Sequence, residues 1–103
     1  MPRVTEDDVA LVVLQIAANQ PNGICSFYRA RAEVPQFLKL SAGDLAPSST
    51  RNGEPMWHQI IRNIQSHHGV DGNYINLGYL RHVPKRGYEA TPAGRNYLKK
   101  LGL

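Results

Sequence analysis

The sequence predicts a mainly α-helical domain of the α+β class that also contains one small antiparallel β-hairpin. Two segments, 9–17 and 57–64, carry apolar residues at the i, i+3, i+4 and i+7 spacing of a helix face packed on a core. A third segment, 79–90, has the pattern of two short strands around a turn at 84–87. Because 103 residues can enclose one hydrophobic core but not two, we expect a single domain spanning 1–103.

The composition is typical of a globular protein, with 42% hydrophobic and 19% charged residues. No apolar run approaches the roughly 20 residues of a membrane span, and the first residues lack the apolar region of a secretory signal. The single cysteine, Cys25, has no partner for an internal disulfide and is expected to be a buried thiol in a reducing compartment. We therefore expect a soluble cytoplasmic protein with no membrane partner.

The formal net charge of +4 is concentrated towards the end of the chain. Residues 80–103 carry six Lys and Arg side chains against one acidic residue, Glu89; the six are Arg81, Lys85, Arg86, Arg95, Lys99 and Lys100. A basic surface of this kind suits a phosphate-bearing partner, and it also suits plain solubility. Arg95, Lys99 and Lys100 are expected to be ordinary solvated surface charges.

A first helix is predicted to start after Thr5, whose hydroxyl can accept from backbone N–H groups while Asp8 reaches back to it. Its apolar stripe over 9–17 is wide, so this helix should be covered on more than one side. The turn-forming cluster at 19–23 ends it. The short apolar segment 24–25 that follows, if extended, would add a third strand to the sheet.

Ser26 is predicted to cap a second helix that starts at Phe27, and Pro35 should end or kink it. Three apolar residues are expected to continue the core beyond this point: Phe37, Leu38 and Leu40. Ser41 and Asp44 repeat the capping-box pattern, which predicts one short helical turn.

The helix predicted over 55–67 is the candidate recognition element. Pro55 suits the first turn of a helix, and Trp57 lies on the apolar stripe, where a core position is expected. The opposite arc presents residue types that hydrogen-bond to base edges and phosphates, namely Gln59, Arg62, Asn63 and Ser66. The alternative is an ordinary amphipathic helix with a solvated polar face.

The rest of the chain completes the element order. Asn73 is expected to cap a short turn that ends at Gly78, and the hairpin over 79–91 follows. Thr91 then caps a last helix with Pro92 at its first position. The apolar side of that helix is formed by Tyr97, Leu98 and Leu101.

Helix, strand, helix, short helix, helix, hairpin, helix is the order of a winged helix-turn-helix domain. The closing motifs are Trp57-x-x-x-Ile61-Arg62-Asn63, Gly78-Tyr79-Leu80, Arg86-Gly87-Tyr88 and Thr91-x-x-Gly94. In these motifs the chain resembles the N-terminal DNA-binding domain of Mrr-type restriction endonucleases, well over 55–101 and by pattern alone over 5–45. The chain departs from that family at HHGVDGN, residues 67–73, which interrupts the passage from the helix to the first wing strand.

The resemblance implies binding of double-stranded DNA without cleavage, as a small regulator or as the targeting module of a restriction-type system. The helix at 55–67 would enter the major groove, where Arg62 suits guanine and Gln59 or Asn63 suits adenine. The basic wing at 79–91 would contact the neighbouring backbone. The expected backbone contacts are Lys85 and Arg86 at the wing, then Arg81, Arg29, Arg31 and Arg51.

Two other function classes compete with DNA binding. A metalloenzyme would need closely spaced ligands, and the scattered residues Cys25, His58, His67, His68, Asp71 and His82 give no such frame. We therefore expect no metal, cofactor or small-molecule substrate and no enzymatic activity. The other class is a protein-interaction module, in which Tyr97, Leu101 and Leu103 offer a two-fold contact for a homodimer.

Overall fold

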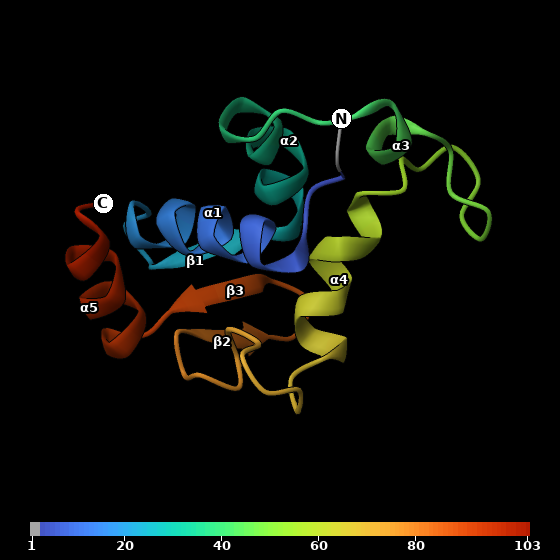
Figure 1. The fold of residues 1–103 in the computed structure, drawn as a ribbon. Coiled ribbons are helices and arrows are strands. Elements are labelled where there is room, and N and C mark those ends of the chain that lie inside the picture. The colour runs from blue at the N-terminus through green and yellow to red at the C-terminus, as the bar shows by residue number, and fades with distance from the viewer. Residues whose placement is uncertain (1–2) are drawn as a thin grey trace.

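The computed structural model describes residues 3–103, which contain five helices and one three-stranded antiparallel sheet (Figure 1). The elements in chain order are α1 (Glu6–Ala18), β1 (Ile24–Ser26), α2 (Phe27–Phe37), α3 (Ala42–Leu45), α4 (His58–Ser66), β2 (Leu80–Val83), β3 (Gly87–Ala90) and α5 (Pro92–Leu101). The α+β class is therefore confirmed. Met1 and Pro2, which belong to the predicted 1–103 domain, lie outside the described residues.

The sheet has the order β1-β3-β2, so the last strand in the chain lies in the middle. Tyr88 on β3 is flanked by Cys25 on β1 and by His82 on β2. The segment 24–25 is thus extended and does add a third strand to the sheet. Tyr88 itself is completely buried, and its side chain points from the sheet into the core.

Helix α1 is the centre of the core and contacts α2, α4, α5 and two strands of the sheet. In Figure 1 it runs along the sheet, with α4 and α5 at opposite ends. Seven of its residues are buried, so it is covered on more than one side as the wide stripe predicts: Val9, Ala10, Val12, Val13, Leu14, Ile16 and Ala17. Trp57, also expected in the core, is 2% exposed.

The predicted helix caps are confirmed. Both capping boxes, Thr5 with Asp8 and Ser41 with Asp44, make their reciprocal hydrogen bonds. Ser26 caps α2 and Thr91 caps α5, whose end is set by Gly102 in the left-handed region. These signals could be read from sequence because each depends on residues three positions apart.

The helix predicted to start at residue 55 starts later in the structure. Pro55 pairs with Pro47 in an isolated antiparallel bridge, and Met56 N–H donates to the carbonyl of Ala46 across 2.8 Å. Trp57 N–H donates to the carbonyl of Asp44 across 3.0 Å. Since these groups are bound to the preceding segment, residues 55–57 form a joint between loop and helix, and α4 begins at His58.

Two expectations about apolar residues are wrong. Helix α2 continues past Pro35 to Phe37, and the last turn leaves Phe37 53% exposed instead of in the core. Leu38 and Leu40, in contrast, pack partly buried against the core as expected. Leu101, predicted on the apolar side of α5, is 46% exposed, because the buried residues of that helix are Gly94 and Leu98 and its last turn extends beyond them.

Two glycines of the closing motifs lie where chains approach closely. A Cβ atom on Gly87 would lie 2.0 Å from the carbonyl oxygen of Cys25 on the neighbouring strand. A Cβ atom on Gly94 would lie 2.2 Å from the carbonyl oxygen of Tyr79. Glycine at these positions lets β1 pair with β3 and lets α5 start directly against the hairpin.

None of the helices over residues 3–103 combines the length and the apolar character needed to cross a membrane.

Candidate nucleic-acid interface

Helix α4 turns its polar arc towards solvent. Ile61 and Ile64 are buried beneath it. On the outward side Gln59 and Ser66 are exposed, and Arg62 and Asn63 are half-buried. All four residues predicted to contact bases therefore lie on the arc that is open to a partner.

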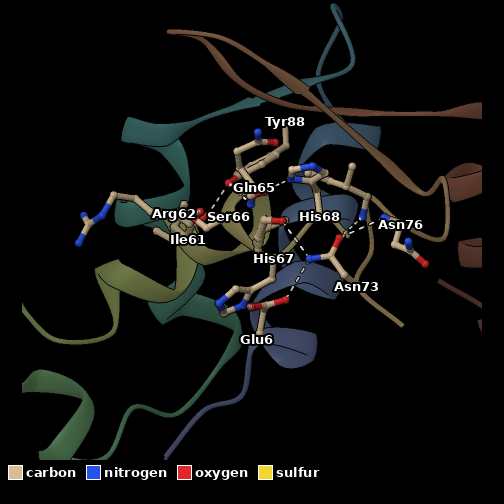
Figure 2. Close-up of polar contacts among 12 residues, drawn as sticks. Glu6, Ile61, Arg62, Gln65, Ser66, His67, His68, Asn73, Asn76 and Tyr88 are labelled. Carbon is tan, nitrogen blue, oxygen red and sulfur yellow. Dashed lines mark hydrogen bonds and ion pairs between the residues drawn. The ribbon is translucent and has the colours of Figure 1, made fainter. Parts of the chain in front are cut away.

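The buried side of α4 is bonded to the central strand through Tyr88 (Figure 2). Its hydroxyl donates to the carbonyl of Ile61 across 2.5 Å and accepts from the N–H of Gln65 across 3.2 Å. Burial raises the pKa of Tyr88 to about 12, so the hydroxyl keeps its proton and acts as a donor. This pair of bonds fixes the distance between the helix and the hairpin.

The end of α4 is held by Asn73, which is 3% exposed. Its amide nitrogen donates to the carbonyl of Ile64 across 2.9 Å and to Glu6 Oε2 across 3.1 Å. Its amide oxygen accepts from the N–H groups of Ile75 and Asn76. One side chain thus joins α4, α1 and the turn that leads to β2 (Figure 2).

The segment HHGVDGN at residues 67–73 also has a structural role. His67 is the C-cap of α4, and its Nδ1 lies 2.6 Å from Glu6 Oε1 on α1. Glu6 in turn accepts from Asn73. The segment bends the chain back so that both of its ends reach Glu6. These three residues were not predicted to meet, because 61 positions separate Glu6 from His67.

A groove with a volume of about 600 Å³ opens beside α4, between the start of α2, the loop before α4 and the hairpin turn. Five cationic residues from these four segments line it: Arg31, Arg51, Arg62, Lys85 and Arg86. We call it the basic groove. His58, Glu54 and the 77% exposed Tyr28 also lie on its wall. Four of the six residues predicted to contact the DNA backbone thus meet next to Arg62.

The hairpin turn does not project from the molecule. Lys85 occupies the left-handed region, with φ of 66°, and the carbonyl of Arg86 accepts from the N–H of Phe27 across 3.3 Å. The turn is therefore docked on the first residue of α2. The segment that projects furthest beside α4 is the loop between α3 and α4, which carries Arg51 (Figure 1).

Two predicted backbone contacts lie outside the basic groove. Arg29 forms an ion pair with Glu33 on the same helix and lines a neighbouring hollow on the other side of the hairpin turn. Arg81 lies opposite Glu89 in the sheet, and its Nη2 is 2.5 Å from Glu89 Oε1. Both guanidinium groups are already paired with carboxylates.

Arg62 is also paired, and its partner was missed in the sequence. Arg62 Nη1 lies 2.7 Å from Glu54 Oε1, with 36% and 21% of the two side chains exposed. The contact is an ion pair without hydrogen-bond geometry, since within the described residues this buried oxygen has no hydrogen-bond donor. Glu54 lies in an irregular loop, so no periodicity places it beside the helix.

His58 lies in the basic groove at the first position of α4. Burial lowers its pKa below the usual value, Arg31 and Arg62 lower it further, and Glu54 opposes them. His58 is therefore mainly neutral near pH 7, and an anion placed in the groove would favour its protonated form.

Gln59 and Asn63 border a different hollow, of about 240 Å³, on the other flank of α4. Asp44 lies at its base with its side chain 2% exposed. Burial opposes ionisation of Asp44, but hydrogen bonds from Ser41 and Val4 outweigh it and hold the pKa below the usual value. Helix α4 thus has a cationic flank at Arg62 and an amide flank at Gln59 and Asn63.

Among residues 3–103, no three His, Cys, Asp or Glu side chains are grouped closely enough to hold a metal ion. Cys25 is buried, and burial raises its pKa to about 12, which leaves the thiol uncharged. The cations of the basic groove are suited to binding phosphates, and the polar side chains of the α4 arc are suited to hydrogen bonding. Comparison of the chain with protein-family models, with curated proteins and with solved structures finds no match.

Proposed function

We propose that this chain is a winged helix-turn-helix domain that binds double-stranded DNA. The element order and the strand order β1-β3-β2 support the fold assignment. The observation that carries the function is the basic groove, where five cations from four separate segments converge beside the exposed polar arc of α4. Only one carboxylate, that of Glu54, lines this groove among residues 3–103.

In this proposal the outward arc of α4 enters the major groove, which is wide enough for a helix and shows a distinct pattern for each base pair. Gln59, Asn63 and Ser66 contact base edges, and Arg62 contacts guanine. The remaining four cations of the basic groove, Arg31, Arg51, Lys85 and Arg86, neutralise phosphates. Arg29 and Arg81 contribute less, because both lie outside the basic groove.

The cellular role follows the sequence resemblance: a cytoplasmic regulator, or the targeting module of a restriction-type system, that binds DNA without cutting it. The competing proposal, a protein-interaction or dimerisation module, does not use the convergence of cations. An analytical-ultracentrifugation run without DNA measures the oligomeric state independently of this assignment.

The test is binding of a fluorescently labelled duplex, measured by anisotropy over a series of salt concentrations. Each neutralised phosphate contributes about 0.9 to the slope of log K against log salt, so the four cations assigned to phosphates give a slope of up to about −3.6. The matched control for charge is Lys99→Ala/Lys100→Ala on α5, which removes two cations away from the groove. Binding that is absent, or that ignores salt, would overturn the proposal.

A further inference from the structure

We infer that Glu54 makes DNA recognition by this domain selective. Its carboxylate pairs with Arg62, which disfavours binding of a phosphate by that guanidinium group but still allows it to bind guanine. This inference rests on the proposed function and assigns a positioning residue to it.

The carboxylate of Glu54 is placed by the main chain of its loop. Glu54 N–H donates to the carbonyl of Arg51 across 3.2 Å, and the Glu54 carbonyl accepts from the N–H of Ser48 across 2.7 Å. The bridge between Pro47 and Pro55 closes the loop behind it. The side chain therefore starts from a fixed point and reaches Arg62 at 2.7 Å.

The surroundings of Glu54 are cationic. Five Lys and Arg side chains and His58 line the same groove. Without Glu54, the guanidinium of Arg62 would be a further free site for any phosphate, at any sequence. With Glu54 in place, a phosphate at Arg62 meets a carboxylate of the same sign, which disfavours it.

Guanine does not meet this penalty. The guanidinium group has five N–H donors in a planar fork, so two can bond to guanine O6 and N7 while the group stays within ion-pair distance of Glu54. The carboxylate then orients Arg62 instead of competing with the base. Selectivity arises because guanine adds no charge beside the ion pair, whereas phosphate places a second anion next to the Glu54 carboxylate.

The chain supplies matched controls. Arg29–Glu33 on α2 and Arg81–Glu89 on the sheet are also Arg–carboxylate pairs, and both lie outside the basic groove. Glu33→Gln and Glu89→Gln remove the same charge as Glu54→Gln. Any effect of overall charge on DNA affinity is common to all three variants.

The experiment first selects a preferred duplex with the wild-type protein from a random pool. Affinities of the wild type and of Glu54→Gln, Glu33→Gln and Glu89→Gln are then measured on that duplex and on a scrambled one. We expect Glu54→Gln to bind the scrambled duplex about 3- to 10-fold more tightly, with a smaller change on the preferred duplex, so that the preference ratio falls. Its salt slope on the scrambled duplex should steepen by up to about 0.9.

A double-mutant cycle shows whether Glu54 acts through Arg62. In an Arg62→Ala background, Glu54→Gln should leave the preference ratio unchanged. Glu54→Asp, which keeps the charge on a shorter arm, should retain the weak binding to scrambled DNA. Both Glu54 variants should fold as the wild type does, because the hydrogen bonds that place the loop are in the main chain. Circular dichroism of both variants checks this.

The outcomes separate the two proposals. If Glu54→Gln behaves as Glu33→Gln and Glu89→Gln do on both duplexes, the selectivity role is wrong while DNA binding stands. If Glu54→Gln lowers the ratio equally with and without Arg62, Glu54 does not act through that residue and the inference is overturned. If the wild type binds no duplex, the proposed function itself fails, and the inference fails with it.

Discussion

The hydroxyl of Tyr88 donates a hydrogen bond to the carbonyl of Ile61 across 2.5 Å, which joins the central strand β3 to helix α4. The same oxygen accepts from the N–H of Gln65, four residues further along the helix. One buried hydroxyl therefore sets how the proposed recognition helix sits relative to the hairpin (Figure 2).

Replacing Tyr88 with phenylalanine should lower the free energy of unfolding by about 1–2 kcal/mol, because a buried carbonyl and N–H lose their partner. Urea denaturation monitored by circular dichroism measures this value. The variant should also lose more affinity for a preferred duplex than for a scrambled one, since α4 is less firmly positioned. Stability equal to wild type would show that these bonds contribute nothing to holding α4.

Arg62→Ala should weaken binding to the preferred duplex by about 1–3 kcal/mol and flatten the preference at the base pair that Arg62 contacts. The reason is loss of a bidentate contact to guanine. Anisotropy titrations on duplexes varied at each position measure it. Equal weakening on every sequence would instead assign Arg62 to the backbone.

Lys85→Ala/Arg86→Ala should reduce the slope of log K against log salt by roughly 1–2 units, because the hairpin turn no longer neutralises phosphates. The control Lys99→Ala/Lys100→Ala has the same net charge, but its substitutions are on α5. Its slope should remain that of the wild type. A slope that changes equally in both variants would remove the hairpin turn from the interface.

Because His58 lies in the basic groove, we expect DNA affinity to rise as the pH falls below about 6.5. Its pKa in the free protein lies below the usual value because of burial, helped by Arg31 and Arg62. Phosphates in the basic groove favour its charged form, so the complex takes up a proton that the free protein does not hold. Anisotropy titrations across this range should show the effect in wild type and lose it in His58→Gln.

The same pKa shift has the opposite sign for folding. Unfolded His58 binds a proton more readily than folded His58, so its contribution to stability is complete above the usual pKa and declines as the pH falls towards the lowered one. Thermal unfolding of wild type and His58→Gln should therefore diverge at low pH. Identical pH profiles would contradict the shift.

Asn73→Ala should lower the free energy of unfolding by about 2–4 kcal/mol, because it leaves the carbonyl of Ile64 and two N–H groups without their partner. Asn76→Ala is the matched control, since Asn76 is exposed and contributes only its backbone N–H to this cluster. Urea denaturation of the two variants compares them directly. Similar losses in both would show that the amide of Asn73 does not anchor α4.

Local patterns predicted the parts of the fold that depend on neighbouring residues. Capping at Thr5, Ser41 and Thr91 follows from residues three positions apart, and the order of helices and strands follows from periodicity. The start of α4 did not follow, because Pro55 is held by its bridge to Pro47 and not by the helix. Pro55 suits either the first turn of a helix or an extended segment, and its pairing with Pro47 decides between them.

The candidate site shows the same division. Helical spacing predicted the outward arc of α4, but only folding brings Arg31 and Arg51 to the groove beside it. The two cations that lie elsewhere had readable partners: Glu33 stands four residues after Arg29, and Glu89 faces Arg81 across the hairpin. Opposite charges at those two spacings would have predicted both ion pairs from the sequence alone.

The docked hairpin turn has a mechanical consequence. Because the carbonyl of Arg86 accepts from the N–H of Phe27, the main chain of the hairpin turn is held against the start of α2. In the proposed complex the duplex backbone therefore approaches Lys85 and Arg86 on a turn that is docked on the domain. Such an interface would favour duplexes whose shape already fits the domain, whereas a mobile wing would adjust to the shape of the duplex.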